Sequence, residues 1–321
     1  MKLIQNEIET FENRVCSHRD FKLAYEAINK LTAFRGRKPK GLFVFGETGS
    51  GKTCLAEYFE AKNYSDETDE LSPIPIVYID VALEKTTGQI ISAMLQKMGD
   101  PTPYNDYENV RRNRAVDLLK SLNVKLVVFD EIQDLIPKKG IKPNSKVYVF
   151  IKHFLNSANV PFLLLGTPDA KELFADDQLF DRFLPAKELR TFSCIGVSHT
   201  TNFACMLDSL LDLMSRNVEA LRFVEYQKDA KGQQLPILKK DINLLLRFCL
   251  ATLGRMRRIN ALLTECIALT SPEKPITQQV LYDAFNEGLN NRGNYNPFHK
   301  DINIQTVKTS LKEKNLYEPI K

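Results

Sequence analysis

The chain has 321 residues, of which 43% are apolar, and this is enough to bury a full core and to form two domains. No apolar run approaches the ~20 residues that a membrane-spanning helix needs. The first fifteen residues, MKLIQNEIETFENRV, lack the apolar stretch of a secretory signal. We therefore expect a cytoplasmic protein with no membrane partner. Six scattered cysteines without a CxxC pair argue against a zinc site and favour buried, reduced thiols.

Apolar periodicity predicts an α/β arrangement in the first part of the chain. Helical spacing over 5–34 is followed by the linker RGRKPKG at 35–41. We expect five short buried strands, at 42–45, 76–81, 124–130, 162–165 and about 186–192. Helical patterns lie between them, at 52–62, 87–98, 107–121 and 145–157. Short apolar strands that alternate with helices indicate a parallel five-stranded sheet with helices on both faces.

After about residue 197 the pattern becomes mainly helical. We expect helices at 199–216, 239–251, 255–269 and 276–289, with a short strand or an irregular insert at 218–226. The last thirty residues are polar and are expected to form an exposed tail. The predicted organisation is an N-terminal helical segment (1–40), an α/β domain (41–196), a smaller helical lid domain (197–289) and a polar tail (290–321).

A phosphate-binding loop follows the first predicted strand. GETGSGKT at 46–53 matches G-x-x-x-x-G-K-[ST] with a strand before it and a helix after it. Its glycines let backbone N–H groups surround phosphate oxygens, Lys52 would reach the β- and γ-phosphates, and the Thr53 hydroxyl would bind magnesium. The alternative is a chance glycine-rich turn, which this context disfavours. The predicted ligands are ATP and Mg²⁺, bound by Gly46, Glu47, Thr48, Gly49, Ser50, Gly51, Lys52 and Thr53.

A second motif is a buried strand that ends in two carboxylates. In KLVVFDE at 125–131, Asp130 is placed to hold magnesium together with Thr53, and Glu131 to polarise a water that attacks the γ-phosphate. An ordinary acidic strand end is the alternative, and the P-loop upstream argues against it. A water-activating glutamate favours hydrolysis over kinase transfer. We therefore predict an ATP hydrolase in which Lys52 and Glu131 are catalytic.

Two later positions fit accessory roles in hydrolysis. Thr167 ends the fourth predicted strand and is expected to hydrogen-bond the γ-phosphate or the attacking water. The alternative is a strand-to-helix turn in which Thr167 or Asp169 is the helix cap. Arg182, in DDQLFDRFLP at 176–185, is expected to reach the ATP of a neighbouring subunit as an arginine finger. Its alternative is an ion pair with Asp177 or Asp181.

In the helical domain, LGRMRRIN at 253–260 opens a helix that carries three arginines. Arg257 has the spacing from Gly254 expected of a second sensor that touches the γ-phosphate. Arg255 and Arg258 are rival candidates, and a basic helix face is the alternative for all three.

The ordered set GETGSGKT, VVFDE, LLGT, LFDRF and GRMR resembles an AAA+ ATPase. The stretches SHRDFKLAYEAINKL with KPKGLFVFGETGSGKT, IVYIDVALEKTTGQIISAMLQKMGDP, and DEIQDLI with LLLGTPDAKELFADDQLFDRF are similar to the TniB/TnsC-type regulators of DNA transposition, over roughly 15–270. Where relatives commonly have His-Pro in the N-terminal helix region, this chain has His18-Arg19. The resemblance implies rings or filaments on double-stranded DNA that link a TniQ-like target-selection protein to transposase subunits, with ATP hydrolysis resetting the assembly.

Two other functions remain open at this stage. A helicase loader or replication initiator would use the same nucleotide site on a different DNA partner. A nucleotide-gated DNA scaffold would bind ATP with little turnover, although Glu131 argues against it. The net charge of +4 permits an acidic partner such as DNA without requiring one.

The best candidate for DNA contact is the loop IPKKGIKPNSK at 136–146. Lysine contacts to phosphates give affinity without sequence choice. The lysines concerned are Lys138, Lys139, Lys142 and Lys146. A second candidate cluster is formed by Arg111, Arg112 and Arg114. Solvated surface charge is the alternative for both.

Overall fold

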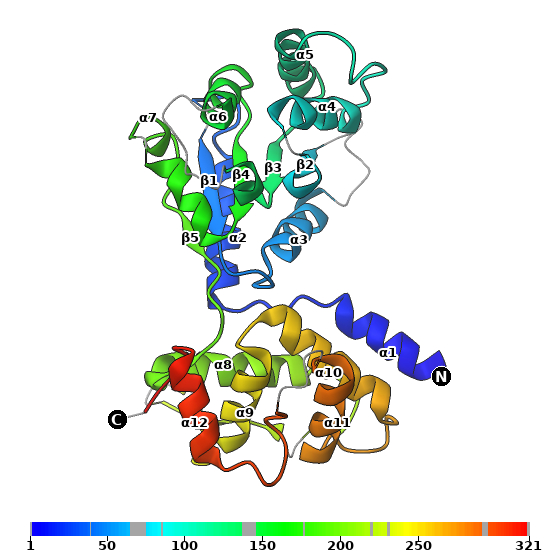
Figure 1. Cartoon of the computed structure of the whole chain (residues 1–321), viewed down its shortest axis with the longest axis vertical. Coiled ribbons are helices and arrows are strands. Elements are labelled where there is room, and N and C mark those ends of the chain that lie inside the picture. Colours follow the sequence, from blue (N-terminus) through cyan, green and yellow to red (C-terminus); the bar gives the residue numbers. More distant parts are fainter. Residues whose placement is uncertain are drawn as a thin grey trace. The chain divides into compact units, whose positions relative to one another are not determined.

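The computed structural model places the chain in two compact units, Arg19–Arg190 and a second unit formed by Met1–His18 with Thr191–Lys321. The residues it describes are 2–38, 40–64, 75–84, 86–136, 146–175, 177–218, 221–229, 232–290 and 295–319. Each unit has its own core (Figure 1).

The first unit is built on a five-stranded parallel sheet with the strand order β2-β3-β4-β1-β5. Its strands are β1 (Gly41–Phe45), β2 (Ile76–Asp80), β3 (Leu126–Asp130), β4 (Phe162–Gly166) and β5 (Lys187–Glu188). The register pairs Asp80 with Asp130 and Phe45 with Gly166. The carboxyl ends of β1, β2, β3 and β4 therefore lie along one edge of the sheet.

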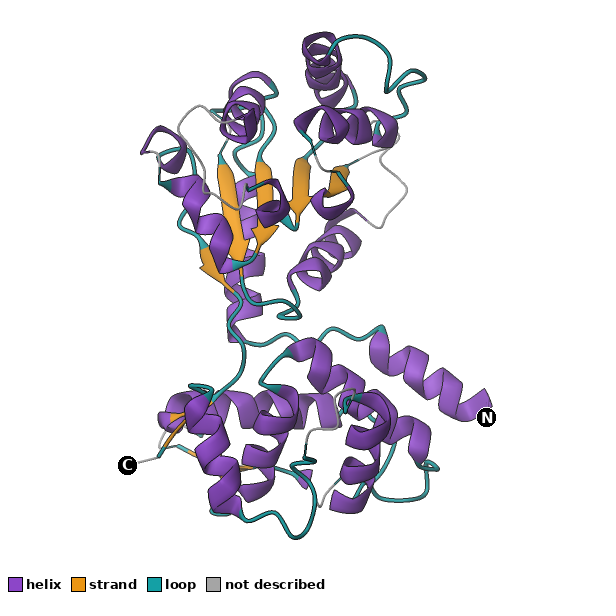
Figure 2. Cartoon of the chain, in the orientation of Figure 1, coloured by secondary structure: helices purple, strands orange, loops and turns teal. Residues whose placement is uncertain are grey.

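Helices lie on both sides of this sheet (Figure 2). They are α2 (Arg19–Thr32), α3 (Lys52–Tyr64), α4 (Thr87–Lys97), α5 (Glu108–Ser121), α6 (Lys146–Ser157) and the short α7 (Asp177–Phe180), with the 3₁₀ turns η1 (Val81–Leu83), η2 (Ile132–Leu135) and η3 (Pro168–Phe174). Phe43 and Phe45 belong to the core that α4, α5 and α6 cover. Leu42 and Val44 are fully buried and point to the opposite face, on which α2 contacts β1. The predicted α/β sheet is confirmed, and burial on both faces explains why β1, β3 and β4 are mostly apolar.

Two predictions for this part of the chain need correction. The fifth strand is only two residues long, not the seven of 186–192. The single helix expected over 5–34 is two helices, because the chain leaves the helical conformation at 13–18. The first of them, α1 (Lys2–Glu12), packs on α10 (Met256–Leu269) and buries Phe11 in the core of the second unit. Residues 1–40 are therefore shared between the two units.

The second unit is mainly helical. Besides α1 and α10 it contains α8 (Gly196–Leu211), α9 (Asn243–Thr252), α11 (Gln278–Gly288) and α12 (Ile304–Glu313). An antiparallel hairpin joins β7 (Val224–Lys228) to β8 (Gln234–Leu238), so of the strand or irregular insert expected over 218–226 a strand forms at 224–226. Two short parallel strands, β6 (Cys194–Ile195) and β9 (Tyr317–Glu318), complete the unit.

The prediction of an exposed polar tail over 290–321 is wrong for the described residues 295–319. These residues form α12 and β9, and α12 packs against α9 (Figure 1). Phe298, Val307, Leu311 and Tyr317 are buried in the core of the second unit. Val307 and Leu311 are four residues apart and therefore lie on the same face of α12. The many Asn and Lys residues around them make this apolar face hard to recognise in the sequence. In the described parts of the chain, no helix is both long and apolar enough to cross a membrane.

Candidate nucleotide site

The P-loop leaves β1 at the carboxyl edge of the sheet and leads into α3. Gly49 and Gly51 have φ values of 81° and 99°, which favour glycine over residues with a Cβ. At Gly46, an added Cβ would lie 2.4 Å from the Leu189 carbonyl oxygen and 2.6 Å from Ser50 Oγ. The Gly46 N–H donates to the carbonyl oxygen of Gly166, 3.1 Å away. The loop is therefore fixed beside the end of β4.

Lys52 lies under this loop and is only 5% exposed. Its Nζ donates to the carbonyl oxygens of Gly46 at 3.0 Å and Glu47 at 3.3 Å. Ser50 Oγ is buried and has no hydrogen-bond partner among the residues described. A buried ammonium, an unpartnered hydroxyl and the N-terminus of α3 together suit an anion, because each is a hydrogen-bond donor or carries positive charge. This donor set fits the phosphates of a nucleotide.

Asp130 ends β3 beside the loop and is 3% exposed. Its Oδ2 accepts a hydrogen bond from Thr53 Oγ1 at 2.6 Å, and its Oδ1 accepts one from the Glu131 N–H at 2.8 Å. The predicted metal-holding pair is thus brought into direct contact. A hydroxyl and a carboxylate are ligands that Mg²⁺ accepts in nucleotide sites.

Sequence reasoning missed Tyr78, whose hydroxyl donates to the same Oδ2 of Asp130. Burial raises the pKa of the Tyr78 phenol, and the hydrogen bond to Asp130 raises it further, so Tyr78 remains a donor at physiological pH. Tyr78 and Asp130 point to the same face because β2 pairs with β3 in register. A tyrosine between the apolar residues of a strand, two residues before its end, was the signal available in the sequence.

Glu131 has an unusual backbone, with φ 53° and ψ 40° in the left-handed region. This conformation costs a residue with a Cβ about 1–2 kcal/mol. Its carboxylate is held by Gln133, whose Nε2 lies 2.5 Å from Glu131 Oε2. Gln133 Oε1 in turn accepts a hydrogen bond from the Thr167 N–H at 3.0 Å. Gln133 was not singled out from the sequence.

Thr167 follows β4 directly and its Oγ1 is buried without a hydrogen-bond partner in the described structure. Thr167 precedes η3, yet its side chain makes no capping hydrogen bond there. The cap alternative therefore lacks the contact that would define it. A buried hydroxyl beside the P-loop remains available for a ligand that carries an oxygen.

Comparison with known proteins agrees with this geometry. The family model described as "Bacterial TniB protein" matches residues 9–192. The chain belongs to the bacterial TniB family. The match includes the P-loop, Asp130, Glu131, Thr167 and Arg182.

Solved structures similar to this TniB-family chain share its AAA+ fold. The Aeropyrum pernix ORC2 protein in ADPNP–ADP complexes superimposes with a TM-score of 0.57 at 15% identity, covering 87% of this chain and 71% of the other. Cdc6p from Pyrobaculum aerophilum gives a TM-score of 0.56 at 16% identity, covering 98% and 86%. By family and fold, the chain is a TniB protein with an AAA+ P-loop fold.

Curated relatives are matched over shorter stretches. An ORC1-type DNA replication protein 1 of Sulfurisphaera tokodaii is 28% identical over 109 residues, which are 33% of this chain and 26% of the relative. An ORC1-type DNA replication protein of Desulfurococcus amylolyticus is 22% identical over 153 residues, 46% of this chain and 38% of the relative. The chain thus matches well under half the length of either relative.

Arg182 of this TniB-family chain lies at the opposite end of β1 from the P-loop. Its carbonyl oxygen accepts from the Gly41 N–H at 2.9 Å, at the first residue of the strand. The strand spans about 16 Å at about 3.3 Å per residue. The Arg182 guanidinium donates to Asn156 Oδ1, and no ion pair joins it to Asp177 or Asp181 in the described structure. Arg182 is thus far from the P-loop of its own chain.

The three arginines of 253–260 differ in their surroundings. Arg258 donates to the Ala251 carbonyl oxygen at 2.9 Å, and burial together with the nearby charge of Arg255 lowers the pKa of Arg258. Arg257, in the first turn of α10, is exposed. Arg258 therefore has a structural role in the turn between α9 and α10, and Arg257 is the arginine whose side chain faces solvent.

The two basic clusters have different outcomes. Lys138, Lys139 and Lys142 lie outside the described residues, and Lys146 is the exposed first residue of α6. Arg112 pairs with Glu108 at 3.0 Å, and Arg114 pairs with Asp100 at 2.7 Å and Asp106 at 2.9 Å. Arg112 and Arg114 are therefore neutralised within their own unit, which argues against this cluster as a DNA contact.

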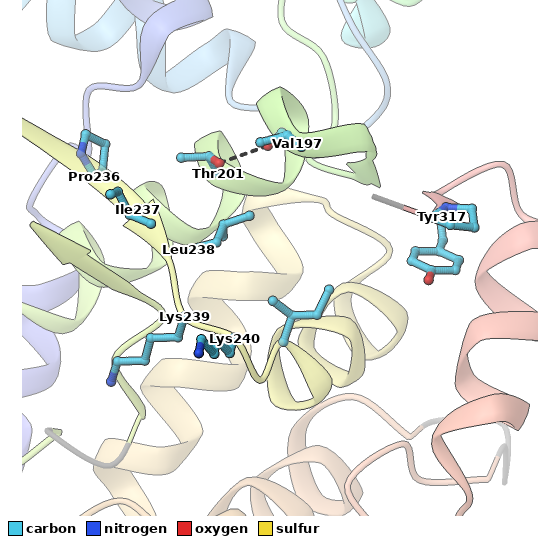
Figure 3. Close-up of a pocket in the computed structure, with 10 residues that line it drawn as sticks. Val197, Thr201, Pro236, Ile237, Leu238, Lys239, Lys240 and Tyr317 are labelled. Carbon is cyan, nitrogen blue, oxygen red and sulfur yellow. Dashed lines mark hydrogen bonds between the residues drawn. The ribbon is translucent and has the colours of Figure 1, made fainter. Parts of the chain in front are cut away.

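A separate cavity of about 570 Å³ lies in the second unit, away from these motifs in the sequence (Figure 3). Val197 and Thr201 of α8, the end of β8 and Tyr317 line it, with Lys239 and Lys240 at the end of β8. The Thr201 hydroxyl is already bonded to the Val197 carbonyl oxygen at 2.9 Å. Its lining is mostly apolar and contains no acid–base pair, so the cavity offers no catalytic constellation.

Proposed function

We propose that this chain binds ATP with Mg²⁺ between the P-loop and the carboxyl end of β3, and hydrolyses it. The observation that carries the proposal is the contact of Thr53 with Asp130 directly beside Glu131. Lys52 and the loop N–H groups bind the phosphates, and Thr53 with Asp130 holds the metal. Bound Mg²⁺ supplies neutralisation of the charge that develops on the phosphate oxygens. Glu131 accepts a proton from water, and the Thr167 hydroxyl donates to the γ-phosphate or to that water.

Assembly of several copies completes the proposed site. Arg182 lies at the amino end of β1 and the P-loop at its carboxyl end, so the arginine finger serves the ATP of a neighbouring copy. A contact between two different edges of the same chain is head-to-tail and generates rings or filaments. In this proposal Arg257 approaches the γ-phosphate as the second sensor.

Nucleotide binding and turnover are tested separately by two variants. Lys52→Ala removes the buried ammonium, and we expect ATP affinity to fall by about 100-fold, as for two charge-assisted hydrogen bonds. Glu131→Gln keeps the shape and is expected to bind ATP normally while phosphate release slows by about 10²–10⁴. Lys62→Ala, at an exposed position of α3, is the control. Equal phosphate release by wild type and Glu131→Gln would refute hydrolysis at this site.

For the biological role, we propose an ATP-dependent regulator of DNA transposition that assembles on double-stranded DNA. It links a TniQ-like target-selection protein to transposase subunits, and hydrolysis resets the assembly. The match of the TniB family model to residues 9–192 supports this role. The test is strand transfer by the cognate transposase, which we expect to depend on the protein and on ATP. Transposition that proceeds equally without the protein would refute the role.

A second candidate is a replication initiator or helicase loader, which the ORC1-type relatives favour. The Aeropyrum pernix ORC1 protein was solved in complex with DNA, and its TM-score to this chain is 0.56 at 14% identity. Loading of a replicative helicase onto a DNA bubble distinguishes this role from transposition. A nucleotide-gated scaffold would release phosphate slowly, and the rate would be the same in wild type and in Glu131→Gln.

Lys138, Lys139, Lys142 and Lys146 are the proposed contacts to duplex DNA. Replacing Lys146 by Ala should weaken binding on all sequences and reduce the salt slope by about one. Arg114→Ala is the matched control, because Arg114 is already paired with Asp100 and Asp106. A larger loss of DNA affinity in Arg114→Ala than in Lys146→Ala would reverse this assignment.

A further inference from the structure

Gln133 joins two functional groups that come from different strands. Its side-chain amide lies between the Glu131 carboxylate, just after β3, and the backbone of Thr167, just after β4. The orientation of the amide is fixed by chemistry. The Thr167 N–H only donates, so it faces Oε1, and the ionised Glu131 carboxylate only accepts, so it faces Nε2. The two hydrogen bonds thus use both ends of one amide.

The surroundings of Gln133 are shaped for this contact. Gln133 lies in η2, which begins directly after Glu131, and its neighbour Ile132 is fully buried against the core. At Gly166, an added Cβ would lie 2.8 Å from Ile132 Cγ2 and 2.9 Å from Gln133 Oε1. A side chain at position 166 would therefore push against the amide where it accepts from the Thr167 N–H.

We propose that Gln133 is a positioning residue that fixes the Glu131 carboxylate relative to the end of β4. This inference rests on the proposed hydrolysis, in which Glu131 accepts a proton from water and the Thr167 hydroxyl donates to the γ-phosphate or to that water. Gln133 touches neither water nor phosphate in this scheme. Its two hydrogen bonds hold the Glu131 carboxylate at a fixed position relative to Thr167 at the end of β4.

Rotation of Glu131 is the motion that Gln133 restrains. The left-handed backbone of Glu131 sets the direction of its Cβ, but the outer torsions of the side chain are held only through the carboxylate. Of the contacts described, the bond from Gln133 Nε2 is the one that reaches this carboxylate. A general base acts when its oxygen lies about 2.6–3.2 Å from the proton donor, and a misplacement of about 1 Å can cost 100-fold in rate. Loss of Gln133 should therefore lower kcat by about 10- to 100-fold.

Two substitutions at Gln133 distinguish the hydrogen bond to Glu131 from the hydrogen bond to Thr167. Gln133→Leu removes both hydrogen bonds. Gln133→Glu keeps an oxygen that accepts from the Thr167 N–H but places a second carboxylate against Glu131. Gln96→Leu, at an exposed glutamine of α4 that bonds the Tyr104 hydroxyl, is the matched control.

The first readout needs no turnover. In the nucleotide-free protein, hydrogen exchange of the Thr167 amide should accelerate in Gln133→Leu and remain like wild type in Gln133→Glu. Affinity for a fluorescent ATP analogue should stay within about twofold in both, because Gln133 does not contact the P-loop lysine or hydroxyls. Unchanged exchange in Gln133→Leu would show that the bond to Thr167 is not formed and would overturn the proposal.

The second readout is kinetic. Both Gln133 variants should lose kcat while KM is retained, and Gln96→Leu should match wild type. Added to Glu131→Gln, Gln133→Leu should cause no further loss, because a residue that acts only through Glu131 has nothing left to position. An additive loss, or a kcat that is unchanged or raised in Gln133→Leu, overturns the inference. If wild type and Glu131→Gln release phosphate equally, the proposed hydrolysis fails first, and the positioning role falls with it.

Discussion

Replacing Leu311 by Ala tests whether the C-terminal segment is part of the fold. Leu311 is fully buried in α12, in the same core as Val307 and Phe298. The substitution removes three carbon atoms, a loss of about 2.4 kcal/mol at about 0.8 kcal/mol per methylene. The cavity that remains brings the expected loss to about 2–5 kcal/mol. For a unit of about 150 residues, a loss of about 3 kcal/mol lowers Tm by roughly 6–12 °C.

The assay is scanning calorimetry combined with far-UV circular dichroism, since the chain contains no tryptophan. The two units are expected to give separate transitions, and only that of the second unit should move. Lys312→Ala is the control, because Lys312 is the exposed next residue of the same helix and its loss should cost under about 0.5 kcal/mol. If Leu311→Ala and Lys312→Ala both have the Tm of wild type, α12 is not packed on the core and the assignment of this segment is wrong.

Three further substitutions have definite expected outcomes. Gly254→Ala should lower the transition of the second unit by more than Leu311→Ala does, because φ is +63° and the new Cβ would lie 1.7 Å from the Phe192 carbonyl oxygen; a wild-type melt would contradict this. Thr167→Val should reduce kcat by about 10- to 100-fold without changing Tm, because Oγ1 has no partner to lose; a parallel loss of Tm would indicate a structural role instead. Burial, assisted by the charge of Arg112, lowers the pKa of His153 below its ordinary value of 6.5. The folded state thus binds this proton more weakly than the unfolded state, and stability falls as the pH drops through about 6.5. His153→Gln should lose less stability than wild type over that range in pH-dependent urea unfolding, and an identical pH dependence would refute the assignment.

The parts of the fold that sequence predicts are those with local physical causes. The P-loop is recognisable because Gly49 and Gly51 require a backbone conformation that glycine readily adopts, and because Lys52 and Thr53 open the next helix. The strands β1, β3 and β4 are recognisable because burial on both faces makes almost all their residues apolar, with Asp130 at the end of β3 as the exception. β5 has only two ladder residues, and the mixed sequence AKELRTF at 186–192 did not show where the strand would end.

Other features depend on distant contacts and leave a weaker trace. The packing of α1 on α10 joins residues more than two hundred positions apart, and helical periodicity over 5–34 does not reveal where the helix breaks. Tyr78 and Gln133 enter the site through strand register and a turn, respectively. The pairing of β2 with β3 brings Tyr78 to Asp130, and the turn η2 brings the Gln133 side chain back to Glu131.

Whether a basic residue is free to bind an anion also depends on contacts that the local sequence does not show. Arg111, Arg112 and Arg114 are three basic residues within four positions, and this density alone makes them a DNA candidate. Arg114, however, is held by two aspartates that precede it by fourteen and eight residues, while Arg111 donates to the Gly88 carbonyl oxygen. A guanidinium that already neutralises carboxylates releases few counterions when it approaches a phosphate. Affinity for a polyanion therefore depends on which charges the fold leaves exposed, and this favours Lys146, which is exposed, over the paired Arg112 and Arg114.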